Sequence, residues 1–235
     1  MAERVLCIAA HPDDEVLGCG GTLAWHRNKG DTVEVLFCAD GVGARLGEGA
    51  TSEAEKDEAQ SQKSERISMA KAALSLLGVS QLCALDFSDN CLDNMPLLQL
   101  IQAIEAVVQR VKPTIIYTHH AGDLNIDHRR VCEAVLTACR PLPETSVKAL
   151  YAFEVASSTG WGEGALPSFV PTVFVDIEKT LPLKMKALEQ YDAEMRDFPH
   201  ARSYQALQAL AAYRGSCVGL SAAEAFVLLR QVCKK

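Results

Sequence analysis

Residues 5–15, VLCIAAHPDDE, decide the fold of this chain. The first five residues form a continuous apolar run, which is typical of a strand buried on both faces of a parallel sheet. His11 and three acidic residues then follow the strand, and an apolar run with glycines at residues 16–23 leads into a helix. In an open α/β sheet, functional sites form where loops leave the carboxyl ends of the strands. The stretch therefore predicts an α/β protein with a functional loop directly after its first strand.

The loop at residues 10–15 is dense in acidic groups. Carboxylates this close together repel one another unless a positive charge lies among them, and a metal ion would supply that charge. The spacing of His11 and Asp14 allows a loop to turn both side chains toward one point, which leaves Asp13 free to act as a base. The alternative is a solvated acidic turn that caps the next helix through its N-terminal dipole.

The composition is that of an ordinary globular protein. The 235 residues are 49% hydrophobic and 23% charged, with a net charge of -7. This acidic balance gives no support for nucleic-acid binding, and no apolar stretch approaches the length of a membrane span. The N-terminus lacks the plan of a signal peptide, and the nine scattered cysteines contain no Cys-x-x-Cys pair. We therefore expect reduced cysteines and a cytoplasmic location.

Apolar strands and amphipathic helices alternate along the rest of the chain. We expect strands at residues 5–9, 32–38, 82–85, 114–117, 149–155 and 172–177, and helices at residues 22–29, 64–77, 96–111, 129–139, 181–191, 204–213 and 222–231. The polar segment at residues 40–63 predicts a mobile loop before about residue 51 and favours helix after it. The alternation predicts a single domain, residues 1–235, with the fold of a Rossmann-like three-layer α/β sandwich around a mostly parallel sheet.

A second loop rich in histidine and aspartate follows the fourth expected strand. Residues 118–128, THHAGDLNIDH, lead into the helix expected at residues 129–139, which places His128 at or near a helix start. Because the carboxyl ends of parallel strands meet at one edge of the sheet, this loop can meet the first one. Two such loops at one edge favour a metal site over an acidic turn. His119, next to His120 on an extended segment, should point to the opposite face and be structural.

These two loops resemble the motifs of the PIG-L/LmbE family of metal-dependent N-deacetylases. Residues 10–15, followed by Gly20 and Gly21, are similar to the opening motif of that family. Four residues of the second loop resemble its second motif, namely His120, Asp123, Asp127 and His128. The resemblance covers residues 4 to about 140 well and is weaker in the C-terminal third, where residues 198–200, Phe-Pro-His, are similar to a sugar-processing branch.

The resemblance implies a metal held by His11, Asp14 and His128, with Asp13 as the general base. Two histidines and one carboxylate leave positions open for water and substrate, and this ligand set suits zinc and also Fe²⁺. The metal would lower the pKa of a bound water, which is the nucleophile, and polarise the amide carbonyl, while Asp13 takes the proton and passes it to the departing amine. We therefore expect a metal-dependent hydrolase that removes an N-acetyl group from an amino sugar or a GlcNAc-containing conjugate. The resemblance also implies a homo-oligomer.

One position departs from the family pattern, which usually reads His-x-Asp-His and uses its first histidine to stabilise the tetrahedral oxyanion. Asn125 stands there in this chain. An asparagine amide can donate a hydrogen bond but carries no charge, so either Asn125 has this role or His120, His200 or Arg202 supplies it. Asp127 either orients the ring of a ligating histidine or caps the helix.

Further side chains are expected to contact the substrate. They are Arg66, which matches a family arginine that contacts substrate hydroxyls, together with His120, Asp123, His200 and Arg202. Arg66 could instead form an ion pair on a helix surface. Trp161 is equally suited to stacking on a sugar ring and to anchoring a packed loop.

Three other functions stay open. The first is a metal-dependent amidase that acts on a non-sugar N-acyl compound. The second is a nucleotide-binding protein with its phosphates at residues 18–21, although these glycines do not fit G-x-G-x-x-G and the acidic loop would repel a dinucleotide. The third is a metal-binding module without catalysis, which the presence of Asp13 argues against. Metal binding without nucleotide affinity would exclude the second function, and acetate release would exclude the third.

Overall fold

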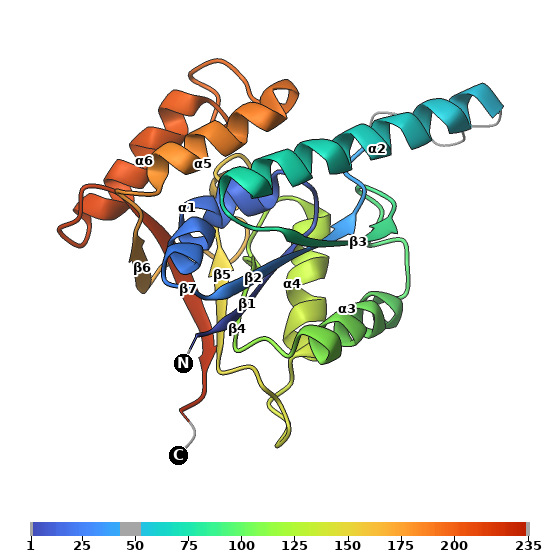
Figure 1. Cartoon of the computed structure of the whole chain (residues 1–235), viewed down its shortest axis with the longest axis horizontal. Helices are drawn as coiled ribbons and strands as arrows, with labels where there is room; N and C mark the ends of the chain where they lie inside the picture. Colours follow the sequence, from blue (N-terminus) through green and yellow to red (C-terminus); the bar gives the residue numbers. More distant parts are fainter. Residues whose placement is uncertain (1, 43–52, 234–235) are drawn as a thin grey trace.

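A seven-stranded sheet with the order β3-β2-β1-β4-β5-β7-β6 runs through the centre of the molecule (Figure 1). The computed structural model describes residues 2–42 and 53–233. The strands are β1 (Arg4–Ala9), β2 (Thr32–Ala39), β3 (Gln81–Phe87), β4 (Ile115–His119), β5 (Ala149–Phe153), β6 (Val173–Asp176) and β7 (Ala223–Gln231). The helices are α1 (Asp14–Asn28), α2 (Glu53–Leu76), α3 (Leu97–Val111), α4 (Ile126–Ala138), α5 (Leu181–Leu188) and α6 (Tyr204–Ser216), with short 3₁₀ helices η2 (Gly160–Gly162) and η3 (Glu189–Glu194).

The prediction of a mostly parallel α/β fold is confirmed. Strand β1 lies between β2 and β4 and pairs parallel with both, so that Val5 stands opposite Val33 on one side and Ile115 on the other. β3 and β5 extend this parallel sheet, whereas β7 is antiparallel to both of its neighbours. The loops that follow β1 and β4 therefore leave the sheet at the same edge.

Helices cover both faces of the sheet (Figure 1). Alternate residues of β1 point to opposite faces. Cys7 packs in a core with residues of α1, α2 and α5, and Ile8 packs in a second core with residues of α3 and α4. The continuous apolar run of the first strand is thus explained by burial on both faces.

The helix predicted at residues 222–231 is wrong, because this segment forms strand β7. Its alanines, leucines and glutamate favour helix locally, but its first four residues are buried between β5 and β6. Phe226 stands opposite Phe153 of β5 and Val173 of β6, and the backbone of β7 supplies hydrogen bonds to both neighbours. Tertiary placement has overridden the local preference.

The bounds of other segments also differ from the prediction. The helix expected at residues 22–29 begins at Asp14, directly after the acidic loop. The helix expected at residues 181–191 ends at Leu188 and continues as η3. Most of the mobile loop predicted before residue 51 lies outside the described residues.

Helix α1 is broken at Cys19, whose φ of -148° and ψ of 18° are not helical. The break leaves backbone groups that need partners. The N–H groups of Gly21 and Thr22 donate to the carboxylate of Glu224 in β7, at 3.0 and 2.7 Å. Lys184 of α5 donates from Nζ to the Leu17 carbonyl at 2.9 Å and pairs with Glu224 at 2.6 Å. This buried ion pair therefore supports the break in the helix whose first residue is Asp14.

Replacement of Lys184 by methionine is expected to lower the free energy of unfolding by about 3–5 kcal/mol, because it leaves the Glu224 carboxylate buried without its counter-charge. Urea denaturation measures the change. Lys186→Met on the exposed side of the same helix is the control and should stay within about 0.5 kcal/mol of the original protein. Equal stability of the two variants would contradict the role given to Lys184.

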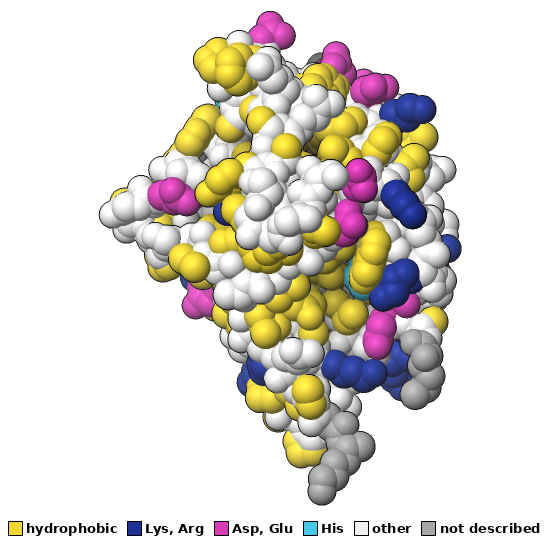
Figure 2. Space-filling model, turned by 90° about the vertical axis from the view of Figure 1, so that its left-hand side faces the viewer, with side chains coloured by type: hydrophobic (Ala, Val, Ile, Leu, Met, Phe, Trp, Pro, Cys, Tyr) yellow, Lys and Arg dark blue, Asp and Glu magenta, His cyan; other side chains and the backbone are white. Residues whose placement is uncertain are grey.

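The side of the molecule that carries α6 and β6 shows acidic and basic side chains interspersed with hydrophobic ones (Figure 2). Among the described residues, no helix combines the length and the apolar character needed to cross a membrane.

Candidate metal centre and active site

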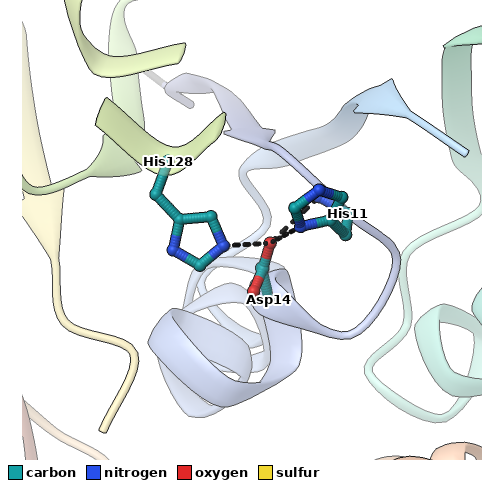
Figure 3. Close-up of side chains that lie close together, drawn as sticks. All are labelled: His11, Asp14 and His128. Carbon is teal, nitrogen blue, oxygen red and sulfur yellow. Dashed lines mark hydrogen bonds and ion pairs between the residues drawn. The ribbon is translucent and has the colours of Figure 1, made fainter. Parts of the chain in front are cut away.

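Three buried side chains point toward one another where β1 and β4 end (Figure 3). His11 comes from the loop after β1, Asp14 is the first residue of α1, and His128 lies in the first turn of α4. Oδ2 of Asp14 lies 3.4 Å from Nδ1 of His11 and 3.2 Å from Nε2 of His128. The two loops that the sequence placed at one sheet edge thus meet.

The three residues fit a metal ion. Their possible ligand atoms all lie within 4.8 Å of one another. Oδ1 of Asp14 is buried and has no hydrogen-bond partner among the described residues, and Nε2 of His128 is buried against the other oxygen of that carboxylate. Burial alone would raise the pKa of Asp14, but the charge of His128 holds that pKa well below its usual range. An ionised carboxylate between two imidazoles is a donor set for a divalent transition metal.

Asp123 fixes the ring of His128 from the side away from Asp14. Its Oδ1 lies 3.1 Å from Nδ1 of His128. Its other oxygen accepts hydrogen bonds from the hydroxyls of Ser158, at 3.0 Å, and Thr159, at 2.6 Å. Carboxylates in this arrangement set the tautomer and orientation of a metal-binding histidine. The structure thus places Asp123 behind His128, where it fixes the ring of that histidine.

Replacement of Asp123 by asparagine is expected to weaken metal affinity about 10- to 100-fold, the range typical of a group that orients a ligand. Competition with a chromogenic zinc chelator measures the affinity. Glu163→Gln, at an exposed position of the loop after Thr159, is the matched control. Unchanged affinity in the Asp123 variant would show that His128 does not depend on this contact.

Asp127 supports the other histidine. Its Oδ2 lies 3.0 Å from Nε2 of His11, and its two oxygens also accept the backbone N–H groups of Asn90 and Leu92. The side chain that caps α4 is Asn125, whose Oδ1 accepts the Asp127 N–H at 2.8 Å. Of the two roles considered for Asp127, the structure favours orientation of a histidine, but the histidine is His11 and not its neighbour His128.

Asp13 lies beside this cluster in a strained backbone conformation, with φ at 132°. Its Oδ2 accepts from Nη1 of Arg202 at 2.9 Å and lies 3.7 Å from Nη2 of Arg66. Burial raises the pKa of Asp13 to about 6, although the charges of both arginines oppose the rise. A carboxylate with this pKa can accept a proton and return it near neutral pH.

Glu15 holds the backbone of Asp13. This fully buried carboxylate accepts the Asp13 N–H at 3.0 Å and the hydroxyl of Tyr191 at 2.8 Å. Burial raises the pKa of Glu15 to about 8. Tyr191 belongs to η3, so a residue far along the sequence helps to fix the acidic loop.

A pocket of about 280 Å³ opens beside the cluster. The described residues that line it are Asn125, His128, Ser157, Ser158, Trp161, Glu194, Arg196, His200 and Arg202. Three predicted residues, Asn125, His200 and Arg202, are therefore brought together with the proposed ligand His128. Trp161 is 57% exposed, and its ring meets the ring of His200 edge-on at 5.4 Å.

His119 and His120 have the reverse of the expected orientation. Period-two alternation puts His119 on the face of β4 that α1 covers. Its Nε2 accepts the Ala10 N–H at 2.8 Å, and its ring stacks on His128 with centroids 3.9 Å apart. His120 instead meets Phe169 edge-on and accepts the Gly122 N–H, outside the cluster.

The structure also adds residues that the sequence analysis missed. Asp89, in the loop after β3, lies 2.9 Å from Nε2 of His11. The one feature of the sequence that pointed to it was the polar loop that leaves β3 at the same sheet edge. Glu194 pairs with Arg66 at 2.8 Å, so Arg66 is buried in an ion pair and does not line the pocket. No sequence pattern marked Glu194, because it lies in a short 3₁₀ helix that no periodicity predicts.

Comparison with known sequences gives consistent matches. The model of the GlcNAc-PI de-N-acetylase (PIG-L) family matches residues 6–139. The uncharacterized deacetylase YaiS of Escherichia coli is 28% identical over 80% of this chain and 89% of its own length. The diacetylchitobiose deacetylase of Thermococcus kodakarensis is 27% identical over 94% of this chain and 81% of its own length.

Comparison with solved structures supports the fold. The N,N'-diacetylchitobiose deacetylase of Pyrococcus horikoshii has a TM-score of 0.74 and 21% identity, over 97% of this chain and 84% of its own. GalB, a 4-carboxy-2-hydroxymuconate hydratase of Pseudomonas putida, has a TM-score of 0.71 and 20% identity, over 100% of this chain and 99% of its own. Because a deacetylase and a hydratase share this fold, the fold alone does not fix the reaction.

Proposed function

Since the chain belongs to the GlcNAc-PI de-N-acetylase (PIG-L) family, we propose that it is a metal-dependent hydrolase that removes the N-acetyl group from an amino sugar or a GlcNAc-containing conjugate. The observation that carries the proposal is the convergence of His11, Asp14 and His128 next to Asp13, a carboxylate suited to proton transfer. The deacetylases similar to this chain supply the substrate class.

The proposed ligands of the metal are His11, Asp14 and His128, and the proposed metal is zinc, with Fe²⁺ as the alternative for the same ligand set. When bound, the cation acts as a Lewis acid that lowers the pKa of water and polarises the amide carbonyl. Asp123 and Asp127 hold the rings of His128 and His11 from behind.

Asp13 is the proposed general base. It accepts a proton from the water that attacks the acetyl carbonyl, and a C–O bond forms. It then gives that proton to the nitrogen as the C–N bond breaks, so that acetate and a free amine leave. Arg202, which lines the pocket, donates to the Asp13 carboxylate at 2.9 Å and so holds its orientation.

Asn125 and Arg202 are the proposed donors to the oxyanion. Because the Asn125 side-chain oxygen caps α4, its Nδ2 group is the part that can donate. Arg202 adds the positive charge that an asparagine in the usual histidine position lacks. His200 lines the same pocket and is proposed to contact the sugar, while the contacts predicted for Arg66, His120 and Asp123 stay predictions.

The test is metal content together with acetate release. Zinc-loaded protein is incubated with N-acetylglucosamine, N,N'-diacetylchitobiose and an N-acetyl amino acid, and both acetate and free amine are measured before and after chelation. Acetate from the sugars that stops on chelation supports the proposal. Acetate from the amino acid alone would favour the non-sugar amidase, and acetate from none of the three would contradict both functions.

Homo-oligomer formation and a cytoplasmic location are further proposals. Light scattering after size-exclusion chromatography tests the first, and cell fractionation tests the second. A monomer at micromolar concentration would contradict the proposed assembly.

A further inference from the structure

Asp13 occupies the N-cap position of α1, but its carboxylate does not cap the helix. An aspartate in this position normally accepts a backbone N–H of the first helical turn. Here the backbone of Asp13 has φ at 132°, and the carboxylate instead accepts from Arg202 at 2.9 Å. The strained conformation thus frees the proposed base from the helix terminus. Because this conformation is costly, it persists only where the surrounding structure holds it.

Two sets of contacts hold Asp13, and the first acts on its backbone. The Asp13 N–H donates to Oε2 of Glu15 at 3.0 Å, and Oε1 of Glu15 accepts the hydroxyl of Tyr191 at 2.8 Å. Glu15 and Tyr191 are both 0% exposed, so water does not stand in for either contact. Removal of one donor from a buried carboxylate is costly for that reason. Tyr191 therefore fixes the carboxylate on which the Asp13 backbone depends.

The second set of contacts acts on the Asp13 side chain. Oδ2 of Asp13 lies 3.7 Å from Nη2 of Arg66, whose Nη1 donates to Glu194 at 2.8 Å. The guanidinium of Arg66 also lies over the ring of Tyr191, 5.8 Å from its centroid. Tyr191 and Glu194 both belong to η3. This short helix therefore reaches the backbone of Asp13 through Glu15 and its carboxylate through Arg66.

The hydroxyl of Tyr191 is the part of this side chain that core packing does not require. The ring packs in one core with residues of α1, α2 and α5, and a phenylalanine ring would fill the same space. Tyr191 is not among the described residues that line the pocket, so its hydroxyl reaches the site through Glu15. A change at this hydroxyl can therefore alter Asp13 without altering the pocket wall.

We propose that Tyr191 is a positioning residue for the deacetylation, because through Glu15 it holds Asp13 in the strained conformation from which the carboxylate acts as base. This inference rests on the proposed function, since Asp13 is the base of that reaction. A small misplacement of a group that transfers a proton slows the chemical step. Loss of the hydroxyl should therefore lower kcat and leave KM unchanged.

Tyr191→Phe tests the proposal with zinc-loaded protein and N,N'-diacetylchitobiose as substrate. We expect kcat to fall by about 10- to 100-fold, while KM and zinc content stay at the values of the original protein. Tyr204→Phe is the matched control, because it removes a hydroxyl that donates to Asp192 at 3.3 Å in an exposed contact. The control should keep both kcat and KM. An unchanged kcat in Tyr191→Phe would overturn the positioning role.

A second background separates positioning from a general structural role. If Tyr191 acts through Asp13, then Tyr191→Phe should slow the Asp13→Asn variant no further, because the base that it positions is already absent. A structural role would instead give the same fold-loss in both backgrounds, and that result would overturn the proposal.

Hydrogen exchange tests the contact without a substrate. Because the Asp13 amide donates to Glu15, we expect the peptide that contains this amide to exchange faster in Tyr191→Phe than in the original protein and in Tyr204→Phe. Equal exchange would overturn the hold on Asp13 even where no substrate releases acetate. Acetate release at equal rates from the original protein and Tyr191→Phe would overturn the positioning role and leave the deacetylase function intact.

Discussion

Replacement of Asp13 by asparagine is expected to lower kcat/KM for acetate release by about 10²- to 10⁴-fold while metal stays bound, because the amide keeps the shape of the side chain but cannot accept a proton. Asp13 is not one of the three proposed ligands, and its carboxylate faces Arg202. The metal content of the purified variant, measured by mass spectrometry, is therefore expected to equal that of the original protein.

Asp197→Asn is the matched control, because this aspartate is exposed on the segment that leads to His200. It should keep full activity. A variant at Asp13 that retains more than about a tenth of the activity would contradict its role as base. Loss of metal together with activity would instead make Asp13 a ligand.

The second large effect is expected at Asp14. Its Oδ2 lies within 3.4 Å of both proposed histidine ligands, so Asp14→Asn removes the one charged ligand and leaves two neutral rings. Metal affinity should fall by more than the 10- to 100-fold typical of an orienting residue, and acetate release should fall below detection. Chelated original protein should recover when zinc is returned, whereas chelated Asp14→Asn should not.

Stoichiometric metal in Asp14→Asn would place the ion elsewhere. Two other groups have ligand atoms close enough to hold one: His119, Asp123 and His128, and His11, Asp89 and Asp127. Asp89→Asn separates them, since it removes a donor from the second group alone. The measurement of metal content therefore distinguishes among three centres that share histidines.

Much of the fold follows from the periodicity of apolar residues and from the turn residues that separate the segments. The buried run before His11 and the strand–helix alternation led to the parallel sheet, because each of the first four strands is short and is followed by a helix. β7 did not follow, since Ala223–Gln231 has helix-favouring residues and becomes a strand only because β5 and β6 offer open edges. The start of α1 at Asp14 could not be predicted for a similar reason. The helix is broken at Cys19, and the contacts that support this break come from Lys184 and Glu224, which are distant in the sequence.

The candidate site likewise contains some residues that the sequence could place and others that it could not. Residues in dense motifs, such as His11, Asp14 and His128, could be placed because parallel strands end at a common edge. The orientation of His119 could not be predicted, because it depends on which face of β4 is covered by α1. Asp123 was expected to contact the substrate but lies behind His128, and Asp89 reaches His11 from a third loop whose path the sequence does not reveal.

The backbone of Asp13 has a consequence for how this protein responds to directed evolution. A φ of 132° is costly for a residue with a Cβ atom, by roughly 1–3 kcal/mol, and glycine would relieve it. A laboratory selection for heat resistance alone should therefore enrich Asp13→Gly and yield variants that are more stable to heat but inactive.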